Sequence, residues 1–399
     1  MKRIYESALR EHHRKYRQMA LLCGPRQVGK TTSCLQVARS PAYYSWDNQA
    51  HRLLISRGPD AIAGDLHLER LRQRPLPVCF DEIHKYSKWK TFLKGFFDVY
   101  GPRTQVTVTG SSRLDVYKRG GDSLMGRYFL YRMHPLSVAE LMHSGVAEGE
   151  TRPPRRLAEA SWQDLLRFGG FPEPFLKADV RFANRWKRLR QQQLFREDLR
   201  DLTRVQEVAQ VEVLAELVRQ QSGQLANYSH FAQRVNVSVD TVRRWLAVLD
   251  SLHYCFAVRP WFRNVAKSLR KEPKIYLRDW SLLEPSGARL ETFVACHLLK
   301  AVQWWEDLGL GTYGLFYLRD KQKREVDFLV ARNNQPWFLV EVKSSQERPL
   351  SDALRHFQSQ TGALHAFQAA LDMPFVDRDC FAIHEPMIVS AKTLLSQLV

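Results

Sequence analysis

The chain of 399 residues lacks several features that would assign it to a common class. Its six cysteines form no C-x-x-C pair and no Cys/His cluster with zinc spacing, so a structural zinc site is not expected. No apolar run approaches the length of a membrane-spanning helix, and the charged residues 1–19 do not have the pattern of a signal peptide. Repeats and low-complexity tracts are also missing, which argues against solenoids and disordered scaffolds. We therefore expect a cytoplasmic, globular protein.

Acidic residues are too few to balance the basic ones. The chain has 60 lysines and arginines against 42 aspartates and glutamates, which gives a net charge of +18. Such an excess favours a polyanionic partner, and nucleic acid is the commonest one. A basic surface that only maintains solubility is the alternative. The length also exceeds what one hydrophobic core fills, so we expect two or three domains.

A phosphate-binding motif follows the first apolar run. Met19 to Cys23 (MALLC) is typical of a buried parallel strand, and GPRQVGKTT comes directly after it, ahead of a helical pattern. In this G-x-x-x-x-G-K-T motif Lys30 is expected to reach the β- and γ-phosphates of ATP, and the Thr31 hydroxyl to bind Mg²⁺. The predicted nucleotide cradle consists of Gly24, Pro25, Arg26, Gln27, Val28, Gly29, Lys30, Thr31 and Thr32.

Two carboxylates end a second apolar run, VCFDE at residues 78–82. Asp81 is expected to hold the Mg²⁺ shell, and Glu82 to polarise the water that attacks ATP. A simple helix N-cap is the alternative for paired acids at a strand end, but a P-loop lies upstream at a typical distance. Cys79 within this run is expected to be a small core residue rather than a reactive thiol.

Two further residues complete the predicted ATPase set. A third strand, residues 106–110, ends in Ser111 and Ser112, either of which is placed to sense the γ-phosphate, and we assign Ser111. Arg127 opens another apolar strand and is either a surface residue or a finger offered to the nucleotide of a neighbouring subunit. The finger requires an oligomer, so we expect a homo-oligomer, with a hexamer as one arrangement.

These motifs together resemble one family. They are GPRQVGKTT, DEIHKYSKWKTFLKGFFD at residues 81–98, TGSS, GR, and HPLS at residues 134–137. They look like the bacterial and archaeal AAA-type ATPases that carry a C-terminal domain of unknown function. The resemblance covers nearly the whole chain and implies ATP and Mg²⁺ as cofactors. His84 stands where we expect glutamine, a departure that lies outside the catalytic acids.

The middle of the chain is expected to contain a small helical lid or linker and a winged helix-turn-helix. Residues 209–258 give three helical patterns, a turn at Asn236, and a last segment that could form the wing strand. In a DNA reader the third helix would present Arg243 and Arg244 to the major groove. A winged helix that packs against another domain is the alternative, and Asp240 does not favour DNA.

Basic residues expected to contact DNA phosphates lie in three segments, with Trp261 and Phe262 interleaved among them. They are Arg243, Arg244, Arg270, Lys271, Lys274, Lys321, Lys323 and Arg324.

The C-terminal pattern resembles the PD-(D/E)xK nuclease core of restriction endonucleases and Holliday-junction resolvases. Glu291 lies on an expected helix, Asp327 on a strand, and Glu341 and Lys343 on one face of the next strand. In that chemistry Asp327 and Glu341 would hold Mg²⁺, and Lys343 would orient water. An ordinary exposed strand is the alternative for E-x-K, and many members of this fold only bind DNA.

The loop of the expected hairpin over residues 326–343 tests that site. A two-residue turn without a bulge would leave Asp327 and Glu341 on opposite faces of the sheet. A three-residue loop, Asn333 to Gln335, would set them opposite each other on one face. We therefore predict a loop with an odd number of residues, or a bulge. We expect Glu291 and Lys343 to lie beside the same cleft.

The sequence therefore predicts an α/β chain in four parts. These are a P-loop AAA-type ATPase core with a parallel sheet (1–135), a helical lid or linker (136–204), a winged helix-turn-helix (205–265) and an α/β restriction-endonuclease-like domain (266–399). The leading function is an ATP-hydrolysing, DNA-binding motor that remodels duplex or branched DNA, such as Holliday junctions in recombination or repair. An ATP-dependent, Mg²⁺-requiring DNA nuclease is the second function, and a nucleotide-switched signalling or toxin-like module is the third.

Overall fold

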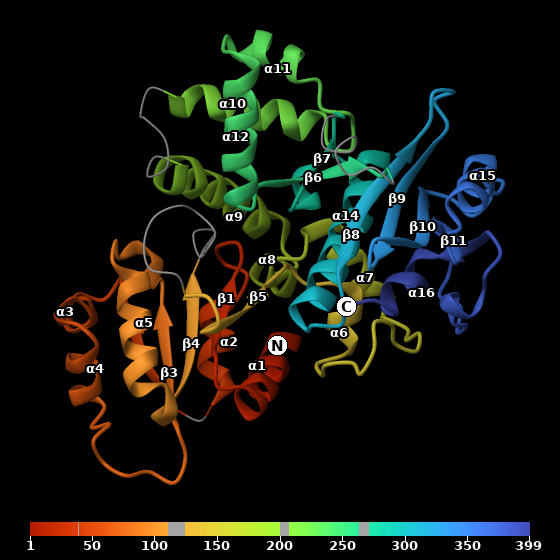
Figure 1. The fold of residues 1–399 in the computed structure, drawn as a ribbon. Helices are drawn as coiled ribbons and strands as arrows, with labels where there is room; N and C mark the ends of the chain where they lie inside the picture. The colour runs from red at the N-terminus through yellow and green to blue at the C-terminus, as the bar shows by residue number, and fades with distance from the viewer. Residues whose placement is uncertain (39, 111–123, 200–206, 263–270) are drawn as a thin grey trace. The chain divides into compact units, whose positions relative to one another are not determined.

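A computed structural model describes residues 1–38, 40–110, 124–199, 207–262 and 271–399 (Figure 1). The chain forms two compact units. Unit 1 contains residues 1–134 and 143–146, and unit 2 contains residues 135–142 and 147–399. Unit 2 therefore begins at the residue that follows His134, within the HPLS motif.

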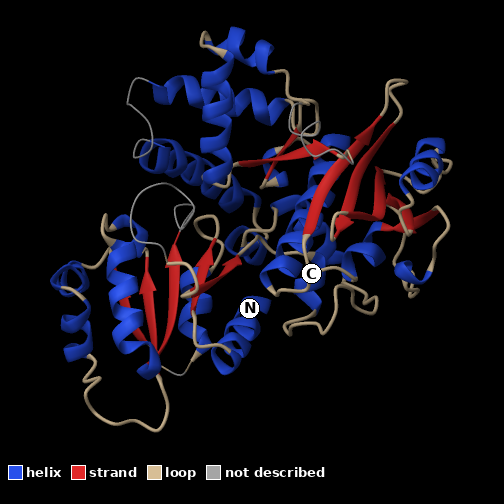
Figure 2. Ribbon diagram, in the orientation of Figure 1, coloured by secondary structure: helices blue, strands red, loops and turns tan. Residues whose placement is uncertain are grey.

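Unit 1 is built on a parallel sheet of five strands in the order β2-β3-β4-β1-β5. Helices lie on both faces of this sheet, as a buried parallel sheet requires (Figure 2). The elements are α1 (Ile4–Lys15), β1 (Met19–Cys23), α2 (Lys30–Val37), β2 (Ala42–Ser45), α3 (Gln49–Arg57), α4 (Pro59–Asp65), β3 (Leu76–Asp81), α5 (Trp89–Tyr100), β4 (Thr104–Gly110) and β5 (Tyr128–Arg132).

Aromatic side chains fix helix α5 against the sheet of unit 1. The rings of Phe92 and Phe96 both meet Phe80 of β3 edge-on, with centroids 5.4 and 5.3 Å away. All three side chains are buried in the same core as Leu21 of β1. This packing holds the carboxyl end of β3, where Asp81 lies, in a fixed position.

Unit 2 is built on a mixed sheet of seven strands in the order β12-β11-β10-β9-β8-β6-β7. Its elements before β7 are α6 (Val138–Met142), α7 (Glu159–Phe168), α8 (Pro172–Lys177), α9 (Val180–Gln193), a π-helical turn (Leu194–Leu199), α10 (Val208–Gln220), α11 (Tyr228–Val235), α12 (Val239–Ser251) and β6 (Cys255–Pro260). The others are β7 (Lys274–Leu277), α14 (Gly287–Asp307), β8 (Tyr313–Arg319), β9 (Glu325–Arg332), β10 (Gln335–Lys343), α15 (Asp352–Thr361), β11 (His365–Ala370), β12 (Met387–Ser390) and α16 (Ala391–Ser396).

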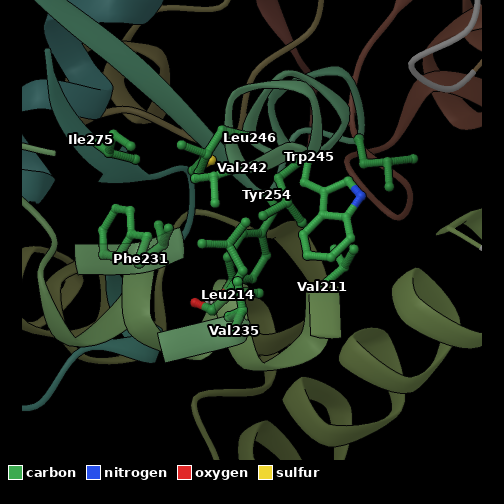
Figure 3. Packing of buried hydrophobic residues seen from close by; sticks show 14 of the residues in the cluster. Val211, Leu214, Phe231, Val235, Val242, Trp245, Leu246, Tyr254 and Ile275 are labelled. Atoms are coloured by element: carbon green, nitrogen blue, oxygen red, sulfur yellow. Dashed lines mark hydrogen bonds between the residues drawn. The ribbon is translucent and has the colours of Figure 1, made fainter. Parts of the chain in front are cut away.

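The three helices expected for a helix-turn-helix are present as α10, α11 and α12. Their apolar faces form one buried cluster around Trp245, Phe231 and Leu214 (Figure 3). Asn236 adopts a left-handed conformation (φ 55°) and ends α11, and the Ser238 hydroxyl accepts a hydrogen bond from the Thr241 amide at the start of α12. The predicted turn chemistry therefore accounts for both helix ends.

The boundary expected between residues 265 and 266 does not separate two sheets. Strand β6 pairs antiparallel with β7, as a wing would, but it also pairs in parallel with β8 of the large sheet. The reason is a long-range pairing: Arg259 and Pro260 lie beside Phe316 and Tyr317. A pairing over that sequence distance leaves no local signal, so the break predicted there was wrong.

Candidate functional site

The phosphate-binding loop joins β1 to α2 with a backbone that needs glycine at its ends. A Cβ atom at Gly24 would collide with the carbonyl oxygen of Met133, in the chain segment after β5. Gln27 and Gly29 both have left-handed conformations, with φ of 63° and 101°. These positions wrap the loop and leave Gly29 as the residue from which α2 begins.

Lys30, the first residue of α2, points back into the loop. Its ammonium group is buried and donates hydrogen bonds to the carbonyl oxygens of Gly24 (3.0 Å) and Pro25 (2.8 Å). Burial lowers the pKa of Lys30, and the charge of Glu82 is the largest effect that opposes this shift. The ammonium group is thus already positioned inside the loop, where phosphate oxygens could replace the two carbonyl acceptors.

The Asp81 carboxylate is hydrogen-bonded to hydroxyl groups from three other elements. Its carboxylate accepts hydrogen bonds from Thr31 of α2 (3.1 and 3.2 Å), Tyr43 of β2 (2.6 Å) and Thr109 of β4. The predicted proximity of Thr31 and Asp81 is therefore present, whereas Tyr43 and Thr109 were not predicted. A carboxylate beside a hydroxyl is the oxygen donor set that Mg²⁺ prefers, so Thr31 and Asp81 fit a nucleotide-bound Mg²⁺. When bound there, the ion would neutralise charge on the transferred phosphoryl group.

Glu82 is held in a left-handed conformation (φ 53°) directly after β3. Strain of this kind in a residue other than glycine is frequent at functional sites. Its carboxylate lies 3.7 Å from His84 Nε2 and 3.7 Å from Lys85 Nζ. Burial raises the pKa of Glu82, with the nearby Lys30 charge as the largest opposing effect. A raised pKa brings a carboxylate closer to the range in which it accepts a proton from water.

Of the other two predicted ATPase residues, the structure describes only Arg127. Ser111 lies outside the described residues. Arg127 lies just before β5 and forms a two-pronged ion pair with Asp98 of α5, with nitrogen–oxygen distances of 2.7 and 2.9 Å. This pair fits the surface interpretation, and a role as a finger stays a prediction.

Arg3 was not predicted to be a site residue, but its side chain donates a hydrogen bond to the phosphate-binding loop. Its buried guanidinium donates to the carbonyl oxygens of Val28 (2.6 Å) and His134 (2.7 Å). The residue just before α1 therefore links the loop to the segment that follows β5. A single arginine at a chain start gives no sequence signal for such a contact.

Cys34 of α2 and Cys79 of β3 are joined by a disulfide bond, with their Cα atoms 6.6 Å apart. Both side chains are buried. The burial of Cys79 agrees with the expected core position, but its pairing with Cys34 was not expected.

A bulge brings the C-terminal carboxylates onto one face. Strands β9 and β10 are joined by a two-residue turn, Asn333-Asn334, with both residues left-handed (φ 51° and 63°). The three-residue loop was therefore wrong, because two asparagines tolerate these conformations without a third residue. A bulge between Pro336 and Phe338 shifts the register by one residue, as a three-residue loop would have done. The predicted bulge is therefore confirmed.

The register after the bulge pairs Val340 with Phe328, and one more step along the same register sets Glu341 opposite Asp327. Asp327 accepts a hydrogen bond from the Val342 amide (2.8 Å), and Glu341 pairs with Lys343 (2.7 Å). One carboxylate oxygen of Glu341 is buried without a hydrogen-bond partner among the described residues. The hairpin therefore brings together three of the four residues predicted for the nuclease site.

Lys274, predicted to contact DNA, instead lies inside this carboxylate cluster. Its ammonium group is 2.6 Å from Glu325, 3.1 Å from Glu291 and 3.7 Å from Asp327, and only 5% of the side chain is exposed. Burial acts to lower the pKa of Lys274, but the three carboxylates outweigh it and raise the pKa. The prediction of a DNA contact was wrong because β7 directs this side chain into the interior.

A divalent cation at Asp327 would have to share this carboxylate with the Lys274 ammonium group, which lies 3.7 Å away. The carboxylates that converge on this side of the sheet already surround an ammonium group. Among the described residues, no group of three or more histidines, cysteines, aspartates or glutamates has an arrangement that could hold a metal ion. The four predicted residues therefore have the types found in a PD-(D/E)xK site, but the Lys274 ammonium group lies close to two of them, Glu291 and Asp327.

The half-buried Asp327 leads to a prediction about how stability depends on pH. Burial, followed by the charge of Glu291, raises the pKa of Asp327 to about 7. Between the ordinary aspartate pKa and this value the folded chain binds a proton that the unfolded chain does not, so the free energy of unfolding should fall as pH rises from about 4 to about 7. We expect Asp327→Asn to remove on the order of 2 kcal/mol of this fall. Urea unfolding of both proteins from pH 5 to pH 8 measures it, and parallel curves would contradict it.

The remaining predicted DNA contacts are at the surface of unit 2. On α12, Arg243 pairs with Asp240 and Arg244 with Glu207, each at 3.2 Å, and both arginine side chains are about 60% exposed. Lys323 is exposed, and Arg324 is held by Asp320 at 2.6 Å. Arg270 lies outside the described residues.

Two of the predicted contacts lie on one groove of about 890 Å³. Lys271 and Lys321, both exposed, line it together with Arg319. Its apolar walls include Trp261, Phe262, Tyr317 and Phe357, and its acidic residues are Glu272 and Asp320. We call this the aromatic–basic groove.

Residues 16–142 match the family model described as "AAA domain". These residues contain the phosphate-binding loop and the strands of the parallel sheet, so unit 1 is similar to AAA-type P-loop ATPase domains. Two models described as domains of unknown function match later parts of the chain, DUF8612 over residues 159–287 and DUF4143 over residues 286–374. In the described parts of the chain, no helix is long and apolar enough to cross a membrane.

The chain is also similar to uncharacterised proteins of Mycobacterium tuberculosis and Mycobacterium bovis. Each is 25% identical over 344 residues, which covers 84% of this chain and 73% of the relative. Among solved structures, the Aeropyrum pernix ORC1 protein in complex with DNA has a TM-score of 0.32 at 16% identity, covering 72% of this chain and 91% of that one. AMPPCP-bound DnaA from Aquifex aeolicus has a TM-score of 0.31 at 12% identity, covering 61% and 86%.

Proposed function

We propose that this protein hydrolyses ATP and couples turnover to the binding of nucleic acid, with DNA as the preferred partner. One observation carries the ATPase part: Lys30 and Thr31 at the start of α2 converge with Asp81 and Glu82 at the end of β3, at one edge of a parallel sheet. In P-loop enzymes this set positions phosphates, Mg²⁺ and the attacking water. Glu82 would orient the water, and Lys30 would stabilise the charge that develops on the phosphate.

The nucleic-acid part rests on charge and on the aromatic–basic groove. A net charge of +18 favours a polyanion. The groove combines lysines and an arginine with the half-buried side chains of Trp261 and Phe262, and basic and aromatic residues together bind a phosphate backbone and stack on unpaired bases. We propose that it receives the DNA strand, and that Arg243 and Arg244 of α12 add contacts to duplex DNA.

The finer parts of the proposal are a homo-oligomer that moves along or remodels DNA, including branched DNA. They rest on the AAA domain and on analogy with junction resolvases. Cleavage of DNA is disfavoured by Lys274, whose ammonium group lies 3.7 Å from Asp327, one of the two carboxylates expected to hold Mg²⁺. A nucleotide-switched signalling module remains the competing function, and it predicts no response to DNA.

The test is ATP turnover measured without DNA and with single-stranded, duplex and four-way DNA. Stimulation by one of these forms supports the proposal and identifies the preferred structure. Equal turnover in all four conditions, together with no detectable DNA binding, favours the signalling module.

Charge reversal in the groove tests the location of the contact. We expect Lys271→Glu with Lys321→Glu to weaken DNA binding and to reduce the salt dependence of the affinity by about two counterions, because two phosphate contacts are lost. Fluorescence anisotropy across a salt series measures both quantities. The matched control is Lys177→Glu with Arg181→Glu, which makes the same charge change at two exposed positions at the end of α8 and the start of α9. Equal losses in the two double variants would show that net charge, not the groove, determines binding.

A further inference from the structure

We propose that the Lys274 ammonium group takes the position of the divalent cation in the carboxylate site of unit 2. The C-terminal domain then keeps the side chains of a nuclease centre without cation-dependent cleavage. This inference does not depend on the proposed DNA-coupled ATPase, because it concerns only residues of the C-terminal sheet and α14.

The first support is the way in which the carboxylates converge on one atom. Glu291 comes from α14, and Glu325 and Asp327 come from β9, yet all three place an oxygen within 3.7 Å of Lys274 Nζ. Lys274 starts β7, the outermost strand of the sheet. A side chain from the sheet edge therefore reaches Glu291 and Asp327, two of the residues predicted for the nuclease site, together with Glu325.

The second support is that neighbouring hydrogen-bond donors also contact the carboxylates that surround the ammonium group. Tyr276, also on β7, donates its hydroxyl to Glu291 Oε1 (2.7 Å), the same oxygen that accepts from Lys274. Arg319 pairs with the other oxygen of Glu325 (2.9 Å). Asp327 accepts from the Val342 amide. Each of the three carboxylates thus has a protein partner besides Lys274.

The charges of this cluster favour one cation, the Lys274 ammonium group, and oppose the entry of a second. Three half-buried carboxylates so close together would repel one another, and a cation offsets that charge. Lys274 supplies it without a metal, and a divalent ion could enter only by displacing a buried ammonium group. The lysine is fixed covalently in the fold, so cation concentration should not affect the cluster.

Binding of Mn²⁺ to the full-length protein tests this proposal. Electron paramagnetic resonance counts bound Mn²⁺ in nucleotide-free wild type, Asp327→Asn, Lys274→Met and the double variant Lys274→Met/Asp327→Asn. Any Mn²⁺ held by the ATPase domain is common to all four proteins, so differences among them report the C-terminal cluster. We expect wild type and Asp327→Asn to bind equally, Lys274→Met to gain about one Mn²⁺ per chain, and the double variant to lose it.

Two results would overturn the proposal. One is Mn²⁺ binding by wild type that disappears in Asp327→Asn. The other is a folded Lys274→Met protein that gains no site. If Lys274→Met does not fold, the comparison of wild type with Asp327→Asn decides alone, together with a cleavage assay on plasmid and four-way DNA in Mg²⁺ or Mn²⁺. We expect no cleavage that depends on Asp327, and cleavage lost in Asp327→Asn or Glu341→Gln would refute the proposal whatever the effect of DNA on ATP turnover.

Discussion

Replacing Lys30 with alanine is expected to lower ATP turnover by roughly 10²–10³-fold, the usual cost of removing one preorganised group that stabilises transition-state charge. The ammonium group of Lys30 is buried inside the phosphate-binding loop, held by the Gly24 and Pro25 carbonyl oxygens. Nothing else among the described side chains of that loop carries a positive charge so deeply buried. Phosphate release at saturating ATP measures the loss.

Glu82→Gln separates binding from hydrolysis in the same domain. Glutamine keeps the size of the side chain but accepts no proton from water, so we expect ATP to bind with little change while turnover falls by a similar factor. Fluorescent-nucleotide binding and phosphate release, measured on one preparation, give both values. Lys88→Ala, at an exposed lysine of the same domain, is the control and should keep normal turnover. Normal hydrolysis by Glu82→Gln would remove the assignment of Glu82 as the base.

The convergence of these residues at one edge of the sheet was predictable because its signals are local. A strand followed by the phosphate-binding loop and a helix start identifies Lys30 and Thr31, and an apolar strand that ends in acids identifies Asp81. Tyr43 and Thr109 also contact Asp81 but come from strands that carry no motif. Hydroxyl residues at strand ends are common, so only the order of strands in the sheet selects these two.

The carboxylate site shows the limit of such prediction more clearly. The bulge that aligns Asp327 with Glu341 could be inferred, because strand alternation forces one choice between two faces. Lys274 could not be placed, because a lysine beside an arginine-rich segment has the same local pattern whether it faces solvent or a buried cluster. Its direction depends on β7 joining the sheet edge through β6, which pairs with β8 far along the chain.

These two sites differ in how they carry positive charge, and this suggests a division of roles. The phosphate-binding loop keeps its lysine where a nucleotide can exchange for backbone carbonyls. The C-terminal cluster uses its lysine to satisfy carboxylates permanently. Under the proposed function, ATP turnover in unit 1 and DNA binding without cleavage in unit 2 would together suit the remodelling of DNA.

A buried ion pair holds the segment that follows the ATPase domain. Lys300 of α14 and Glu140 of α6 pair directly, and both side chains are about 1% exposed. The same ammonium group donates to the Pro135 carbonyl (3.1 Å) and the Ser137 hydroxyl (2.9 Å). Pro135 and Ser137 of the HPLS motif are thus held by one lysine about 160 residues later in the chain.

Lys300→Met is therefore expected to lower the free energy of unfolding of unit 2 by about 3–5 kcal/mol, because it leaves the Glu140 carboxylate buried without its cation. Lys392→Met is the matched control: Lys392 pairs with Glu159, whose side chain is 58% exposed, so its loss should cost under about 1 kcal/mol. The double variant Lys300→Met/Glu140→Leu removes both charges and should recover part of the stability. Urea unfolding of the four proteins measures these differences. If Lys300→Met costs no more than Lys392→Met, water must reach Glu140, and the ion pair does not anchor the HPLS segment.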